Sequence, residues 1–391
     1  MVELQSENNF KTKGAVLMDD ESIVKFLDEI YKKSESLSRS FLKDADMSQR
    51  VEMICRAKHA STRVIMACML GVINNPNADP RKPYTEIKTD DCFSGRKYDE
   101  KFLNEFIKKN NLPCNTTTGF LTPAYRTKSQ PLNVGIDLPT RSKSVVNALL
   151  QLLDDVAQKK ALAKEVLLET VRVLIVIRDE EQARLQTLLK SLNDNVVEIP
   201  LSSEDIIALI RKHLQCNHVS RLPVLIVAAA YHVAENKLGE RILPLHSHTA
   251  ADKQTGAIGD IEICLEGDDE VVTAYEMKLK HVTKNDVDLV LSKIACVDHK
   301  IHNYIFISTE KIHSAVAEYV ASLYQATGGI EITILDCLGF LRHFLHLFHR
   351  LRGEYLNAYQ ELVLNEPDSS VSQTLKEAFL TLRKNAEMMV D

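Results

Sequence analysis

The stretch GDIEICLEGDDEVVTAYEMKLK (259–280) decides the fold of this chain. Two runs, AIGDIEICLE (257–266) and VVTAYEMKLK (271–280), are rich in β-branched and apolar residues. They flank Gly267-Asp268-Asp269, a turn-forming sequence. Strand-like runs around such a turn are typical of a β-hairpin, so the sequence predicts two antiparallel strands here.

The flanking sequence predicts the other elements of a mixed core. Apolar run length and periodicity indicate a buried helix, a short strand, the hairpin, a helix, a strand buried on both faces and one more strand. In chain order, these lie at 222–238, 241–248, 257–266, 271–280, 284–297, 302–308 and 331–335. The expected fold class is therefore α+β, or mixed α/β, and rich in helix.

Helical periodicity continues on both sides of this core. It predicts helices at 19–43, about 47–74, 143–215, 337–363 and 371–388. The run VRVLIVI (171–177) is ambiguous between buried helix and strand, and we interpret it as helix. The segment 75–141 is rich in X-Pro steps and looks helical only at 101–110.

Three regions follow from this organisation. We expect a mainly helical region at 1–215 with a loop segment at about 75–130, a core at 216–335 and a helical C-terminal extension at 336–391. Loops as long as the one at 75–130 are usually functional.

Composition excludes several classes of protein. The 391 residues include 48 Lys or Arg and 54 Asp or Glu, a formal charge of −6, which excludes a wholly basic DNA coat protein. The eight cysteines are scattered without a CxxC pair, and no apolar run reaches the length of a membrane span. We therefore expect reduced thiols in a cytoplasmic protein that does not contact membranes. No Walker A, G-x-G-x-x-G or G-x-S-x-G motif supports NTPase, dinucleotide or serine-hydrolase chemistry.

The hairpin carries a D-x15-E-x-K arrangement of Asp260, Glu276 and Lys278. Because side chains alternate along a strand, Glu276 and Lys278 share one face. Asp260 joins that face only if the hairpin loop has an odd length or one strand contains a bulge. A three-residue loop at 268–270 would set Asp260 opposite Lys278.

Carboxylates that converge in this way suit Mg²⁺, which prefers oxygen ligands and keeps several waters. Asp260, Glu276 and Met277 are the candidate metal ligands. Asp260, Glu276 and Lys278 are the candidate catalytic residues, with Lys278 orienting or helping to deprotonate an attacking water. Such a site suits phosphodiester hydrolysis. The alternative is a solvated hairpin face with an ordinary Glu/Lys pair, and other [DE]-x-K triplets occur, although not on a paired strand.

The expected order of elements resembles the αβββαβ core of the PD-(D/E)xK nuclease superfamily, here with helical N-terminal and C-terminal additions. Upstream, SGRKYDE (94–100) and TTTGFLTPAYR (116–126) resemble SacI-like type II restriction endonucleases. The likeness spans about 75–130 and 235–310. One departure is Gly259 before Asp260, where the superfamily frequently has Pro.

The resemblance implies a Mg²⁺-dependent, site-specific endonuclease that cleaves double-stranded DNA at a short palindrome, which by likeness alone is GAGCTC. It also implies a homodimer, since a two-fold dimer most simply reads a palindrome. A bacterial cytosol and a cognate DNA methyltransferase in the same host follow from the biology of restriction.

Candidate DNA contacts lie in the 75–130 loop segment, because Arg, Lys and Asn are the side chains that reach phosphates and base edges. These candidates are Arg96, Lys97, Asn115, Thr116, Thr117, Arg126 and Lys128. Glu235, on the helix before the hairpin, is a possible supporting residue. Two alternatives remain open: a non-catalytic DNA-binding or scaffold protein on a nuclease-like fold, and a structure-specific repair nuclease.

Overall fold

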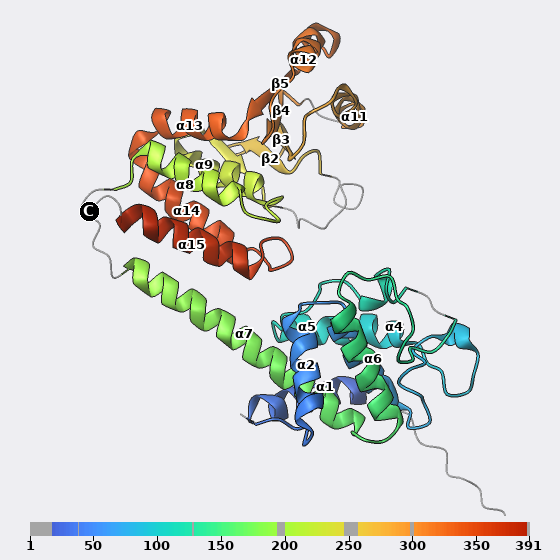
Figure 1. The fold of residues 1–391 in the computed structure, drawn as a ribbon. Coiled ribbons are helices and arrows are strands. Elements are labelled where there is room, and N and C mark those ends of the chain that lie inside the picture. The colour runs from blue at the N-terminus through green and yellow to red at the C-terminus, as the bar shows by residue number, and fades with distance from the viewer. Residues whose placement is uncertain are drawn as a thin grey trace, which may run out of the picture. The chain divides into compact units, whose positions relative to one another are not determined.

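The computed structural model describes residues 18–37, 39–126, 129–193, 200–245, 257–297 and 301–388. The chain divides into two compact units, Met1–Gln182 and Ala183–Asp391 (Figure 1). The boundary falls inside a long helix, and each unit has its own elements and its own core. None of the helices in the described ranges is long and apolar enough to cross a membrane.

Unit 1 is built almost entirely from helices. Its elements are α1 (Asp20–Glu35), α2 (Ala45–Arg56), α3 (Ser61–Asn74), the turn η1 (Thr85–Ile87), α4 (Gly95–Tyr98), the π-helical turn η2 (Asp99–Leu103), α5 (Asn104–Lys109), the turn η3 (Gly119–Leu121), α6 (Lys143–Ala157) and the first part of α7 (Ala163–Asn193). VRVLIVI (171–177) lies within α7, which confirms the helical interpretation.

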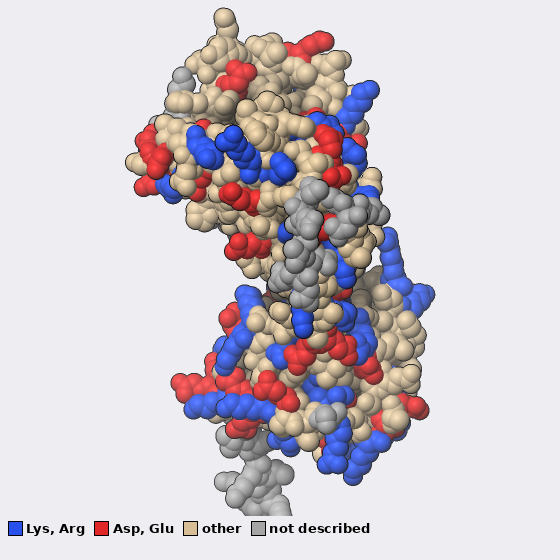
Figure 2. Space-filling model, turned by 90° about the vertical axis from the view of Figure 1, so that its left-hand side faces the viewer, with Lys and Arg blue, Asp and Glu red and all other residues tan. Residues whose placement is uncertain are grey.

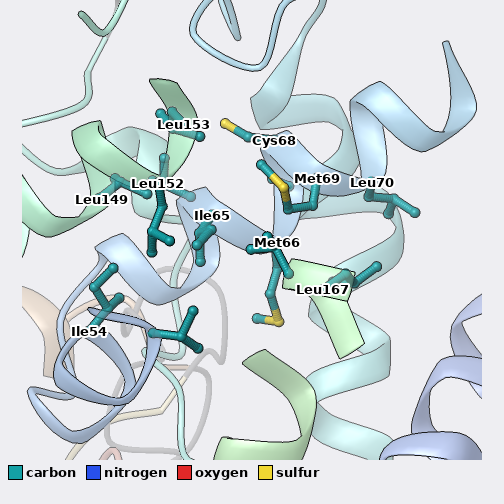
Figure 3. Close-up of a cluster of buried hydrophobic side chains, with 14 of the residues drawn as sticks. Ile54, Ile65, Met66, Cys68, Met69, Leu70, Leu149, Leu152, Leu153 and Leu167 are labelled. Atoms are coloured by element: carbon teal, nitrogen blue, oxygen red, sulfur yellow. The ribbon is translucent and has the colours of Figure 1, made fainter. Parts of the chain in front are cut away.

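The centre of unit 1 is α3. Almost every residue of α3 is buried, as expected of a helix that is apolar on all sides. Figure 3 shows Ile65, Met66 and Met69 of α3 among leucines of α6 and α7. The other elements of unit 1 are thus arranged around one central helix.

Two expected helices are shorter in the structure. The helix expected at 47–74 is interrupted between α2 and α3, where Lys58 has a φ of 48°. There the ring of His59 accepts from the main-chain N–H of Ser61 at 3.2 Å. The helix expected at 19–43 ends at Glu35, just before Ser36, whose hydroxyl donates to the Lys33 carbonyl. Serine side chains that bond locally to the backbone favour helix ends.

The helix expected at 101–110 begins earlier than predicted. Helical structure runs from Gly95 through α4, η2 and α5 to Lys109. Ser94 is the N-cap, because its hydroxyl accepts from the main-chain N–H of Lys97. The segment SGRKYDE therefore forms the start of a helix. The sequence did not predict this start because the surrounding X-Pro steps indicated a loop.

A buried ion pair joins this helix to α3 and to the TTTGF loop. Arg63 and Asp99 are 1% and 0% exposed, with 2.7 Å between Nε and Oδ1. The second carboxylate oxygen of Asp99 accepts from the Thr118 hydroxyl and the Gly119 N–H. Arg63 also donates to the carbonyl of Asn115. The pair therefore fixes the loop that carries several of the DNA-contact candidates.

Unit 2 contains a five-stranded mixed sheet and helices on both of its faces. Its elements are the end of α7, α8 (Ser203–Leu214), α9 (Leu222–Leu238), β1 (Glu240–Ile242), β2 (Ile261–Leu265), β3 (Val271–Lys278), α11 (Lys284–Ile294), β4 (Asn303–Ser308), α12 (Ser314–Ala326), β5 (Glu331–Asp336), α13 (Cys337–Leu347), the turn η4 (His349–Leu351), α14 (Arg352–Asn365) and α15 (Gln373–Met388). The helix–strand order expected from the sequence is present. The strand expected at 241–248 ends at Ile242, and 246–248 lie outside the described residues.

The strands lie in the order β1-β2-β3-β4-β5. β1, β2 and β3 pair antiparallel, whereas β3, β4 and β5 pair parallel. The apolar side chains of one face belong to the same cluster as those of α8, α9 and α13 to α15, and the side chains of the other face belong to a cluster with α11 and α12 (Figure 1). The sequence organisation placed α8 and α13 to α15 outside the core, whereas the structure packs them in the same unit as the sheet.

His213 of α8 connects three helices inside unit 2. Its Nε2 lies 3.1 Å from the carbonyl of Leu375 and its Nδ1 lies 3.0 Å from the hydroxyl of Tyr359. A carbonyl only accepts, so Nε2 donates to it and Nδ1 accepts from the tyrosine. Burial lowers the pKa of His213 to about 4, even though the Leu375 carbonyl acts in the opposite direction. The imidazole is therefore neutral in the folded protein.

Replacing Asp99 by alanine is expected to destabilise unit 1 by about 3–5 kcal/mol, because the buried Arg63 would lose its charge partner. The neighbouring Glu100→Ala change removes only an exposed pair with Arg96 and should cost under about 1 kcal/mol. Denaturant unfolding monitored by circular dichroism measures both. Equal losses for the two variants would contradict this role of the buried pair.

The His213 environment also predicts acid sensitivity. The pKa of His213 is 6.5 in the unfolded chain and about 4 in the folded chain. Between pH 6.5 and pH 4, His213 is therefore protonated in the unfolded chain and neutral in the folded chain. Stability present above pH 6.5 is therefore lost as the pH falls, by up to about 3 kcal/mol from this group. A His213→Gln variant should unfold with a flatter pH dependence over this range. Parallel curves for the variant and the natural chain would refute the assignment.

Candidate active site

The register of β2 against β3 determines which side chains meet. Ile261 lies opposite Tyr275, and a bulge falls between Ile263 and Cys264. The side chains of Ile261 and Tyr275 face α9, so alternation directs Asp260, Glu276 and Lys278 to the opposite face, beside α11. Of the possibilities that the sequence left open, the structure has the bulge and not the three-residue loop at 268–270, since residues 266–270 connect the strands. Asp260 accordingly lies beside Glu276 and Met277 instead of opposite Lys278.

Asp260 is held directly against β3. Its main-chain N–H donates to the carbonyl of Tyr275 at 2.7 Å. Its Oδ2 accepts from the main-chain N–H of Met277, also at 2.7 Å. These two bonds fix the carboxylate next to the residues on either side of Met277, which are Glu276 and Lys278.

Gly259 explains the departure from proline before Asp260. A Cβ at this position would lie 2.5 Å from the carbonyl oxygen of Tyr275 and 3.2 Å from its carbonyl carbon. These are main-chain atoms of a paired strand and have little freedom to move. The close approach that brings Asp260 onto β3 therefore requires glycine at 259.

Glu276 is surrounded by three donor groups. Lys278 Nζ lies 3.1 Å from its Oε1, and Lys293 Nζ of α11 lies 4.0 Å from its Oε2. The hydroxyl of the buried Tyr304 contacts the same Oε2 at 3.2 Å and the Ile258 carbonyl at 3.0 Å. Tyr304 thus ties β4 to both the glutamate and the segment that precedes Asp260.

α11 supplies a carboxylate that sequence reasoning missed. Asp286 Oδ1 lies 3.4 Å from Lys278 Nζ. Its other oxygen completes a capping box with Thr283 at the start of α11. The T-x-x-D spacing before an apolar helix was a readable signal for this cap, although nothing in it indicated a contact with Lys278.

Lys278 and Asp286 shift each other's pKa toward the charged form. Burial would lower the pKa of Lys278, but Glu276 and Asp286 outweigh it and raise the pKa. Burial would raise the pKa of Asp286, but the Thr283 hydrogen bonds and Lys278 together lower it. Both shifts favour the charged forms, so the Lys278 ammonium faces the Asp286 carboxylate.

The metal-ligand candidates differ in what they offer. Asp260 and Glu276 contribute carboxylate oxygens, whereas the side chain of Met277 packs against the apolar core on the other sheet face. Met277 can therefore offer only its main-chain carbonyl. Within the described ranges, no group of three or more His, Cys, Asp or Glu is arranged to hold a metal ion.

Glu235 is not drawn into this cluster. It is half-buried near the end of α9, where its carbonyl accepts from Gly239. In the part of the chain that the structure describes, no hydrogen bond or ion pair joins its side chain to Asp260, Glu276 or Lys278. Its supporting role stays a prediction.

The DNA-contact candidates lie in unit 1 and are only partly brought together. Arg96 and Arg126 are exposed and line one cavity of about 200 Å³, together with Ser94. Lys97 is also exposed on α4, and Thr116 and Thr117 are exposed beside the half-buried Asn115. Lys128 lies outside the described residues.

Glycine at 259 yields a stability test. Gly259→Ala should lower the free energy of unfolding by about 1–3 kcal/mol, because the added methyl group overlaps the Tyr275 main chain. Gly353→Ala is a matched control, since a Cβ there meets nothing within 4 Å. Denaturant unfolding of both variants measures the difference. A Gly259→Ala protein as stable as the control would show that the strand can move aside.

Comparison with known proteins gives one result for this unit. Residues 198–310 match the family model of the SacI restriction endonuclease C-terminal domain. The match runs from just before α8 to just beyond β4 and includes Asp260, Glu276, Lys278 and Asp286. It does not include the 75–130 stretch, and no curated protein matches the chain. The match supports the identification of this chain as a SacI-like type II restriction endonuclease.

Proposed function

We propose that this restriction endonuclease hydrolyses a phosphodiester bond in each strand of a short palindromic DNA site, using Mg²⁺ held by Asp260 and Glu276. The observation that supports the proposal is the ion pair of Glu276 with Lys278, on the sheet face to which strand alternation also directs Asp260. The Oδ2 of Asp260 accepts from the main-chain N–H of Met277, which lies between Glu276 and Lys278. The family match covers all three residues. By likeness alone, the recognised sequence is GAGCTC.

The donor set at this face fits a magnesium ion. Two carboxylates and a main-chain carbonyl are hard oxygen ligands, and Mg²⁺ usually keeps several waters beside one or two carboxylates. When bound there, Mg²⁺ would polarise the scissile phosphate and lower the pKa of a bound water.

The protein groups have separate parts in this reaction. Asp260 and Glu276 supply the negative charge that attracts the ion, and Tyr304 orients the carboxylate of Glu276. Lys278 carries a positive charge next to Glu276, where it can orient the attacking water or contact the negatively charged phosphate. Lys293 adds a second positive charge on the same side of Glu276.

DNA recognition is assigned to the exposed cations of unit 1. Figure 2 shows Lys and Arg side chains interspersed with Asp and Glu over the visible face of both units. A chain with a net charge of −6 must therefore bind DNA through local groups such as Arg96 and Arg126. A homodimer would present one active site to each strand of the palindrome.

A digestion of long duplex DNA of known sequence tests the proposal. Discrete fragments are expected with Mg²⁺ and none with EDTA, and the fragment ends would identify the site. Glu276→Ala and Lys278→Ala should each lower the cleavage rate by about 100-fold or more.

Glu270→Ala is the matched control, because Glu270 is an exposed carboxylate just before β3 on the same hairpin. Circular dichroism verifies that each variant is folded. Intact DNA with the folded natural chain would favour a non-catalytic binding protein, and cuts confined to junctions or flaps would favour a repair nuclease. Full activity of the Glu276 and Lys278 variants would remove this site from the reaction.

A further inference from the structure

Asp286 makes two kinds of contact at once. Its Oδ2 accepts from the main-chain N–H of Thr283 at 2.9 Å and from the Thr283 hydroxyl at 2.5 Å. Its Oδ1 faces Lys278 Nζ at 3.4 Å. The capping box therefore fixes the carboxylate on one side and leaves the other oxygen directed at the lysine.

Lys278 needs a partner other than Glu276. A metal ion bound to Glu276 competes with Lys278 for the same carboxylate, whose Oε1 lies 3.1 Å from Nζ. A long lysine side chain that loses its partner gains rotamer freedom and spends less time in one place. Asp286 keeps a carboxylate beside Nζ when Glu276 is occupied.

On the basis of the proposed function, we infer that Asp286 is a positioning residue: it holds the ammonium of Lys278 at the reacting phosphate while Glu276 binds the metal ion. Asp286 touches neither metal nor substrate in this role and acts through Lys278. The sequence motif of the site thereby extends from D-x15-E-x-K to include an aspartate eight residues beyond Lys278, at the start of α11.

Two substitutions at position 286 distinguish the contact with Thr283 from the contact with Lys278. Asp286→Asn retains an oxygen that can accept from Thr283 but loses the charge beside Lys278. Asp286→Glu keeps the charge, and glutamate is an ordinary partner in a capping box. Asp288→Asn is the control, because Asp288 is an exposed carboxylate on the same helix and accepts a hydrogen bond from the Tyr319 hydroxyl instead of facing Lys278.

The first measurement does not depend on cleavage. The folded proteins are treated with acetic anhydride, and acetylation of Lys278 is followed by peptide mass spectrometry. Asp286→Asn should increase the acetylation rate of Lys278 several-fold, whereas Asp286→Glu and Asp288→Asn should match the natural chain. An unchanged rate in Asp286→Asn would overturn the inference.

The second measurement is single-turnover cleavage beside DNA affinity measured without Mg²⁺. Asp286→Asn should cleave about tenfold more slowly, the size expected for one contact to a charged group, with unchanged DNA affinity and a folded circular dichroism spectrum. Asp286→Glu should restore the rate. The positioning role would be overturned if the cleavage rate fell equally in Asp286→Asn and Asp288→Asn. It would also be overturned if Asp286→Glu cleaved as slowly as Asp286→Asn.

The two proposals fail in different ways. If the natural chain cuts no DNA under any metal condition, the proposed function fails, while the acetylation result still reports on the Asp286–Lys278 contact. Suppose instead that the natural chain cuts DNA and that Asp286→Asn has the same cleavage rate and the same Lys278 acetylation rate as the natural chain. In that case only the positioning role fails.

Discussion

The register between β2 and β3 is the constraint on which the candidate active site depends. A shift of one residue would turn Asp260 toward α9 and away from Glu276 and Lys278. The bulge at Ile263/Cys264 and the close approach of Gly259 to Tyr275 hold the pairing in place. Apolar packing reinforces it, because a strand slipped by one residue would turn Ile261 and Ile263 away from the apolar cluster that they share with α9.

Sequence patterns predicted the elements of unit 2 well because their signals are local. The helix at 222–238 has the predicted bounds, and the hairpin strands lie within their predicted runs. The bulge was not predictable, since an extra residue in β3 changes the register without changing composition. Asp286 was missed because its contact with Lys278 depends on how α11 returns to the sheet. The sequence left open whether an odd loop or a bulge would direct Asp260 to the face of Glu276 and Lys278, and the structure contains the bulge.

In unit 1, some residues of the distinctive segments SGRKYDE and TTTGFLTPAYR have a structural role and do not have to bind a ligand. Asp99 of SGRKYDE and Thr118 and Gly119 of TTTGFLTPAYR meet around the buried Arg63. A buried charge without a partner is costly, so this part of the resemblance has a structural explanation. The exposed Arg96 and Arg126 lie outside that network, and Arg96 pairs with Glu100 at the surface.

The mixed pairing of β3 has a consequence for the order of folding. Its contacts with β2 are local, as in the bond between Met277 and Asp260, whereas its parallel pairing with β4 must wait until α11 has folded back. Contacts of greater sequence separation generally form later. Tyr304 on β4 therefore reaches Glu276 late, and we expect a half-folded chain to have the hairpin without a finished charge cluster. In such an order, the charge cluster would be completed only when β4 has paired with β3.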